Sequence, residues 1–110
     1  MDKTTEVKEA IEYYKECVDT LSKKAHDYAQ DGDCFSNFKK IASTVNIPIE
    51  KVFLVFMAVK IARIVELVEK GGTKVGESIQ DSCGDLANYS CLLNLYENEE
   101  DRNEVRRMQD

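Results

Sequence analysis

Apolar residues recur at helical spacing along the first quarter of the chain. From about Thr5 to Ala29 they lie three or four positions apart, a period typical of an amphipathic helix with one buried face. These positions are Val7, Ala10, Ile11, Tyr14, Cys17, Val18, Leu21, Ala25 and Tyr28. The sequence QDGDC then interrupts the pattern with residues that favour turns. We therefore expect one long helix followed by a turn.

A shorter helix is predicted next. Its apolar stripe consists of Phe35, Phe38, Ile41, Ala42 and Val45. Asn46 and Pro48 mark the end of this helix and the start of another, since proline suits the first turn of a helix.

The third segment, from Pro48 to about Lys70, carries the sequence VFLVFMAVKIARIVELV and is apolar almost all round. Such a helix is expected to be covered by neighbouring helices or by another subunit. The β-branched residues alone would also allow a strand for the first eight positions. The continuation at helical spacing through Ile61, Ile64 and Val68 favours a helix.

Gly71 and Gly72 are expected to stop that helix, and a fourth is predicted from roughly Lys74 to Glu97. One face of it carries Ile79, Cys83, Leu86, Ser90 and Leu93. Residues 98–110 are strongly charged and have no core-forming pattern, which indicates a helix extension or a frayed end. The prediction is an all-α fold: one helical domain over residues 1–97 and a charged C-terminal tail or helix extension over residues 98–110.

The composition and net charge favour some classes of function and argue against others. The 110 residues are 43% hydrophobic and 33% charged, as in a soluble globular domain. A net charge of −6 argues against general binding to DNA or RNA, which needs a basic surface. It leaves open a local cationic pocket, and also an acidic protein that imitates nucleic acid.

No secretory or membrane signal is expected. The first ten residues are too charged for a signal peptide, and the longest apolar run, Val52 to Val59, is too short to cross a bilayer. The four cysteines lack CxxC pairing and only one histidine accompanies them, so we expect no zinc site. Reduced thiols in a cytoplasm are the expectation, with neither nucleic acid nor membrane as a partner.

Two cations stand out on the third helix. On a helical wheel Lys60 falls within an apolar stripe that includes Phe53, Phe56 and Leu67, and Arg63 lies about 60° away. Burial of an unpaired cation costs several kcal/mol, so each needs a partner or a route to water. One interpretation is a snorkelling lysine and an arginine in an ion pair within the chain. The other is an anion pocket, with Arg63 as a forked donor and Lys60 as a point charge.

The fourth helix carries the possible counterparts of these cations. Glu77, Asp81, Asp85 and Asn88 share one stripe, opposite the apolar face of that helix. They are interpreted as a solvated face, as paired carboxylates that bind a metal, or as partners of Lys60 and Arg63. In the last case the charges could also close into a structural network.

The segment between the first two helices contains His26, Asp27, Tyr28 and, further on, Asn37. A lone histidine here is more often a surface residue than a catalytic one. The DGD sequence lacks the spacing and terminal glutamate of a calcium-binding loop, and the chain has no phosphate-binding glycine loop and no convincing nucleophile–base pair.

The order and spacing of these residues resemble a phage and prophage family, the nucleotide modification associated domain. The resemblance covers about residues 20 to 95. It is carried by Lys24, Asp27, Tyr28, Phe35, Asn37, Phe38, Lys60, Arg63, Glu77, Ser78, Asp81, Asp85 and Tyr89. It implies a viral or prophage origin, with the host cytoplasm as location, and a link to nucleotides.

A more distant similarity is to the all-α nucleoside triphosphate pyrophosphohydrolases of the MazG type, through DSCGDLANY at residues 81–89. It implies a compact, MazG-like bundle of about four helices. Those enzymes hold Mg²⁺ with an ExxE motif on one helix and an ExxD motif on the next. Here Lys60 and Arg63 stand near the place of the ExxE acids, and Ser82 stands where an ExxD acid is expected. Mg²⁺ needs oxygen ligands and would be repelled by two cations.

The leading hypothesis is a nucleotide-binding protein that does not use metal-dependent hydrolysis and that sequesters a nucleotide signal of host defence. Lys60 and Arg63 would contact phosphates, and Tyr28, Phe35 or Tyr89 would stack on a base. The expected ligand-binding set is Lys60, Arg63, Asp27, Tyr28, Phe35, Asn37, Asp81, Asp85 and Tyr89, with no catalytic residue and no cofactor. The over-apolar third helix suggests a homo-oligomer.

Two rivals remain at this point. The first is a Mg²⁺-dependent pyrophosphohydrolase whose metal ligands would be Glu66, Glu69, Asp81 and Asp85. The second is an acidic helical inhibitor that imitates DNA and binds a host nuclease.

Overall fold

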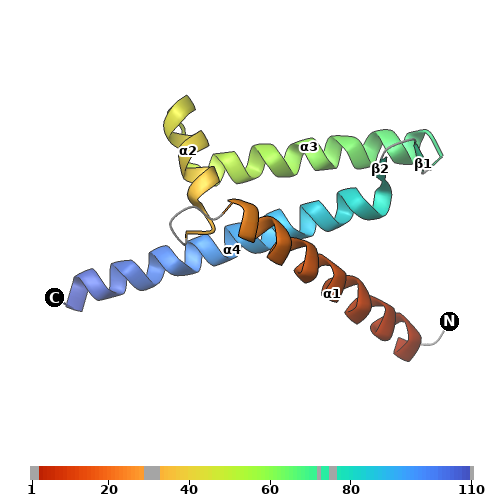
Figure 1. Cartoon of the computed structure of the whole chain (residues 1–110), viewed down its shortest axis with the longest axis horizontal. Helices are drawn as coiled ribbons and strands as arrows, with labels where there is room; N and C mark the ends of the chain where they lie inside the picture. Colours follow the sequence, from red (N-terminus) through yellow and green to blue (C-terminus); the bar gives the residue numbers. More distant parts are fainter. Residues whose placement is uncertain (1–2, 29–32, 72, 75–76, 110) are drawn as a thin grey trace. The chain divides into compact units, whose positions relative to one another are not determined.

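Over the residues that the structure describes, the fold is all-α, as predicted, with four helices and one very short hairpin (Figure 1). The computed structural model describes residues 3–28, 33–71, 73–74 and 77–109, with side chains for residues 4–24, 33–71 and 78–109. The helices are α1 (Lys3–Tyr28), α2 (Ser36–Val45), α3 (Ile49–Glu69) and α4 (Ile79–Gln109). Strands β1 (Thr73–Lys74) and β2 (Glu77–Ser78) pair antiparallel between α3 and α4. Within these described residues, no helix is both long and apolar enough to cross a membrane.

The ends of α3 agree closely with the sequence pattern. Pro48 is the N-cap with φ −59° and ψ 144°, the extended conformation that leads into a helix. At the other end, the Lys70 N–H donates to the carbonyl of Glu66, and Gly71 has a φ of 90°. Glycine adopts this left-handed conformation without a steric penalty, so Gly71 stops the helix as expected.

The start of α4 differs from the prediction. Lys74, where the helix was expected to begin, lies in β1, and α4 begins at Ile79. The Asp81 N–H donates to Ser78 Oγ at 3.1 Å, and the Ser78 N–H donates to Asp81 Oδ2 at 3.4 Å. This reciprocal cap satisfies N–H groups of the first turn, which explains why the helix starts here. At its other end α4 continues to Gln109, so the described part of the charged tail is a helix extension.

The chain divides into two compact units, Met1–Asn37 and Phe38–Asp110, and each is described by itself. In the first unit taken by itself, most of the predicted apolar face of α1 is not covered. Val7, Ile11, Tyr14 and Val18 are all exposed, and Cys17 is the buried member of the stripe. The amphipathic pattern therefore marks a face that residues of its own unit leave largely uncovered. The expectation of one domain over residues 1–97 stays a prediction.

In the second unit, α3 and α4 run side by side in opposite directions and form the main packing contact (Figure 1). Phe53 is fully buried and stacks on Phe38 of α2, with ring centroids 4.4 Å apart. It also contacts Tyr96 of α4 at 6.3 Å, and Val52 beside it is almost fully buried. This aromatic core joins α2, α3 and α4 through one face of α3.

The opposite face of α3 is exposed. Large apolar side chains on it retain about half of their accessible surface, namely Leu54, Val55, Val59, Ile61, Val65 and Val68. The helix that looked apolar all round is therefore covered on one side within its unit and uncovered on the other.

Candidate functional site

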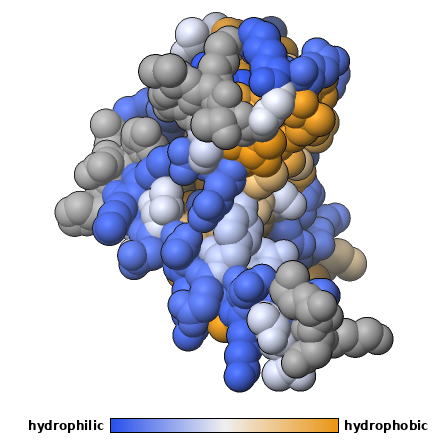
Figure 2. Space-filling model, turned by 90° about the vertical axis from the view of Figure 1, so that its right-hand side faces the viewer, coloured by the Kyte–Doolittle hydropathy of each residue, from blue (hydrophilic) through white to orange (hydrophobic). Residues whose placement is uncertain are grey.

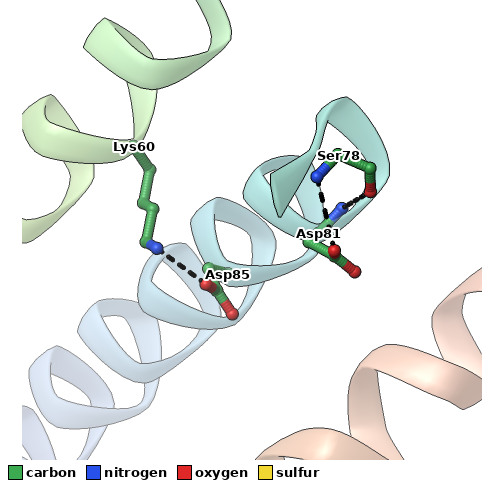
Figure 3. A network of polar contacts seen from close by, with 4 residues as sticks. All are labelled: Lys60, Ser78, Asp81 and Asp85. Carbon is green, nitrogen blue, oxygen red and sulfur yellow. Dashed lines mark hydrogen bonds and ion pairs between the residues drawn. The ribbon is translucent and has the colours of Figure 1, made fainter. Parts of the chain in front are cut away.

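Lys60 lies on the covered face of α3, where the helical wheel placed it. Its Nζ forms an ion pair with Asp85 Oδ2 of α4 at 2.9 Å (Figure 3). The two side chains retain only 18% and 19% of their accessible surface. The pair therefore bridges the two helices while both charged groups are largely withdrawn from water.

Arg63 lies elsewhere. One turn further along α3, it is exposed to solvent, whereas Lys60 is partly buried. Each cation was expected to need a partner or a route to water: Lys60 has the partner on α4, and Arg63 has the route to water. An arginine that reaches water avoids the cost of burying its charge.

The face of α4 that is turned inward is polar in its first half. Of the stripe formed by Glu77, Asp81, Asp85 and Asn88, the last two are withdrawn from solvent, which corrects their interpretation as part of a solvated surface. Ser82 is fully buried, Asn88 is nearly so, and Asp85 lies between them. Further along the same face Leu92 is buried. The spacing of these positions is that of a helical seam, so the polar groups face α3 instead of the solvent.

Asp81 has a different environment from Asp85. It is exposed and takes part in the cap with Ser78 (Figure 3). Its carboxylate is therefore already used to begin α4. The side chain of Glu77 lies outside the described residues.

An aromatic pair adjoins the ion pair. Tyr89 of α4 meets Phe56 of α3 with ring centroids 5.5 Å apart and an interplanar angle of 61°. Phe56 precedes Lys60 by one turn, and Tyr89 follows Asp85 by one turn, so the antiparallel helices place the two contacts in successive layers. Tyr89 also meets Phe38 edge-to-face at 6.4 Å. A charged layer and an aromatic layer thus lie next to each other between α3 and α4.

The electrostatics of the Lys60–Asp85 pair follow from its burial. Loss of hydration at both ions offsets much of their attraction, so the intact pair contributes little net stability. Removal of one partner leaves a charge in an environment that has few water contacts, which is strongly unfavourable. Each charge of the pair is therefore stabilised in the interior by the other.

The structure does not bring the whole expected ligand-binding set together. Lys60, Asp85 and Tyr89 lie in neighbouring layers, Asp81 caps α4, and Arg63 is exposed. The side chains of Asp27 and Tyr28 lie outside the described residues. Phe35, which is buried, and Asn37 belong to the unit Met1–Asn37 and are described with that unit alone.

The alternative metal ligands are not gathered either. Glu66 forms an ion pair with Lys70 at 2.7 Å, one turn further along the chain. Asp85 pairs with Lys60. Across the side chains that the structure describes, no three histidine, cysteine or acidic residues lie together in a group that could hold a metal ion.

Sequence reasoning missed the burial of Ser82 and the aromatic layer formed by Phe56 and Tyr89. Both have a signal in the sequence. Ser82, Asp85, Tyr89, Leu92 and Tyr96 recur at alternating steps of three and four, the pattern of a packing seam. The signal was obscured because the first two of these residues are polar and burial was inferred from apolar residues.

Comparison with known proteins assigns the family. Neither a curated relative nor a solved structure matches the chain. The model of the family described as Nucleotide modification associated domain 1 matches residues 24–95, which include α2, α3 and the part of α4 that carries Asp85 and Tyr89. Because the match covers well over half of the sequence, the chain belongs to the Nucleotide modification associated domain 1 family.

Proposed function

We propose that this protein binds a phosphorylated nucleotide between α3 and α4, where the Lys60–Asp85 pair adjoins Tyr89, and that it does so without metal-dependent hydrolysis. The observation that carries the proposal is the charged pair itself, at 2.9 Å and with four-fifths of each side chain withdrawn from water. A polar interior of this kind is costly for a small helical unit, and perturbed interior charges concentrate at functional sites. The family's description, which concerns nucleotide modification, also supports a nucleotide as the ligand.

The chemistry of the residues suits a nucleotide. An ammonium group has three donors, so Lys60 can bond to Asp85 and still donate to a phosphate oxygen. The carboxylate of Asp85 can accept hydrogen bonds from sugar hydroxyls or from the amino group of a base. Phe56 and Tyr89 supply an aromatic contact one turn away. Arg63, at the exposed edge of α3, would act as a forked donor to a further phosphate.

Binding without a metal is favoured by the charges around the site. Mg²⁺ requires several oxygen ligands, whereas the interior position on α3 is a lysine whose ammonium would repel the ion. The acids that a metal would need are engaged elsewhere: Asp81 caps α4, and Glu66 pairs with Lys70. Direct contact of Lys60 with phosphate would take the place of a metal bridge.

The use that we propose for such binding is sequestration of a nucleotide signal of host defence in the host cytoplasm. It is motivated by the resemblance to phage and prophage proteins and by the small size of the chain. The distant similarity to MazG-type enzymes also stays a prediction.

The decisive experiment identifies the ligand first. Mass spectrometry of small molecules released from the purified protein, followed by calorimetry with nucleoside triphosphates and cyclic nucleotides, is expected to show a bound nucleotide. Lys60→Ala is expected to weaken binding roughly tenfold to a hundredfold, the range for a charge-assisted phosphate contact. Lys70→Ala, which removes an exposed lysine of the same segment, is the matched control and should bind like the wild type. Circular dichroism of each variant verifies that the helices are intact.

Three results would reject the proposal. One is that no nucleotide binds, or that Lys60→Ala binds as well as the wild type. Another is Mg²⁺-dependent release of pyrophosphate that Asp85→Asn abolishes, which would favour the pyrophosphohydrolase. The third is co-purification with a host nuclease in the absence of any nucleotide affinity, which would favour the acidic inhibitor.

A further inference from the structure

The exposed face of α3 carries a regular apolar seam, which we call the outer seam. It consists of Leu54, Ala58, Ile61, Val65 and Val68, at alternating steps of four and three residues. All five are exposed, and the four larger ones retain between 49% and 60% of their accessible surface. Figure 2 shows hydrophobic surface that reaches solvent beside hydrophilic surface. An average spacing of 3.5 residues is the repeat by which one helix packs lengthwise against another.

The composition of the outer seam suits a helix as its partner. Ala58, near its middle, leaves room for close approach of a second backbone. On one side of the seam, Val55 and Ala62 are exposed and uncharged. With their neighbours, these side chains present on the order of 500 Å² of apolar surface, which is at the upper end of what monomeric proteins expose.

We propose that the outer seam binds the outer seam of a second copy of this chain, with the two α3 helices antiparallel. Two such faces would bury on the order of 1,000 Å² in total, about the minimum for a specific interface. A face that packs on itself needs only two-fold symmetry, the commonest arrangement of soluble oligomers. The proposal does not depend on nucleotide binding, because Lys60 lies on the opposite face of α3.

Charged residues at the two ends of the outer seam favour an antiparallel arrangement of the two α3 helices. Lys51 is exposed one turn before Leu54, and Glu69 is exposed directly after Val68. In an antiparallel pair, Lys51 of each copy lies opposite Glu69 of the other, so both ends carry opposite charges. In a parallel pair, Lys51 would meet Lys51 and Glu69 would meet Glu69. The antiparallel direction therefore places Ala58 of one copy across from Ile61 of the other.

The first test measures the mass in solution. Sedimentation velocity is expected to give twice the 12.5 kDa of one chain for the wild type. Val65→Lys should give the mass of a single chain, because a lysine in the outer seam would be buried against its counterpart. Val105→Lys is the matched control, since Val105 on α4 is exposed to the same extent as Val65, 52% against 50%, and lies outside the seam. It should remain dimeric.

The second test determines whether the two α3 helices of the dimer are antiparallel. Two variants, Ala58→Cys and Ile61→Cys, are made in a background with the exposed cysteines replaced, Cys34→Ser and Cys91→Ser. On oxidation, a mixture of the two variants is expected to form a disulfide-linked pair that neither variant forms efficiently alone. Likewise, Lys51→Glu and Glu69→Lys should each dimerise roughly threefold to tenfold more weakly alone and recover when mixed.

Three results would contradict the proposed dimer. A wild-type chain that stays monomeric at 100 µM would overturn the proposal, whether the seam is covered by α1 of the same chain or by a foreign protein. A dimer that survives Val65→Lys would place the interface elsewhere. Efficient self-linking of Ala58→Cys alone would overturn the antiparallel direction.

Discussion

The substitution Asp85→Asn removes the carboxylate that pairs with the Lys60 ammonium. Four-fifths of the Lys60 side chain is withdrawn from water. Breaking a fully buried pair from one side costs about 3–5 kcal/mol, and breaking an exposed pair costs about 0–1 kcal/mol. The low but nonzero exposure of both groups places Asp85→Asn between these limits, at about 2 kcal/mol of unfolding free energy. For a chain of this length, 2 kcal/mol corresponds to a fall in melting temperature of roughly 8–16 °C.

A double-mutant cycle isolates the interaction between Lys60 and Asp85 from their other contacts. Lys60→Met keeps much of the side-chain volume, and the double variant Lys60→Met/Asp85→Asn removes both charges. The double variant should recover much of the loss, because it removes both charges from the interior, and the coupling free energy should exceed about 1 kcal/mol. Urea unfolding at pH 7, followed by circular dichroism, gives all four free energies. A coupling below about 0.5 kcal/mol would mean that water screens both charges, and the account of a withdrawn ion pair would be refuted.

Two further predictions concern α4. Ser78→Ala removes the acceptor of the Asp81 N–H and should lower the unfolding free energy by about 1 kcal/mol in urea unfolding, whereas Ser90→Ala, at an exposed position in the middle of α4, should not. The pKa of Glu97 is raised from its ordinary value of 4.5, mainly by desolvation and then by the charge of Glu50 and a hydrogen bond with it. The folded chain therefore favours the protonated form of Glu97. Wild-type Glu97 therefore contributes stability below about pH 4.5 that is lost as the pH rises through the folded-state pKa. Glu97→Gln should thus melt at a higher temperature than the wild type at pH 7, and this advantage should vanish near pH 4. The same substitution at Glu104, two turns further along α4, is its control, and an equal gain there would contradict the assignment of the effect to the surroundings of Glu97.

The sequence predicted the helices well where local chemistry decides their ends. Pro48 and Gly71 fix α3 through backbone conformations that do not depend on distant residues. The start of α4 was placed too early because the pairing of β1 with β2 and the Ser78–Asp81 cap depend on a geometry that periodicity does not carry.

The wheel placed Lys60 correctly because the position of a residue on a helix follows from the helical repeat alone. The inner face of α4 could not be predicted in the same way. Ser82, Asp85 and Asn88 are polar, and what allows their burial is the surroundings that α3 supplies. On α1 most of the apolar face is not covered within its own unit. An apolar stripe shows that a surface favours being covered, but not which surface covers it.

The alternation of a charged layer and an aromatic layer between α3 and α4 also fixes how the two helices are aligned. If α4 slid by one turn, about 5.4 Å, in one direction, Lys60 would face Tyr89 and lose its carboxylate. A slide in the other direction would offer Lys60 the carboxylate of Asp81 but would set Phe56 against Asp85, with the charge of Asp85 on an aromatic ring. Each shifted alignment therefore breaks one layer, and only the observed register satisfies both at once. An entirely apolar seam would pack nearly as well after a slip, so the same polar residues that cost stability give α3 and α4 a single alignment.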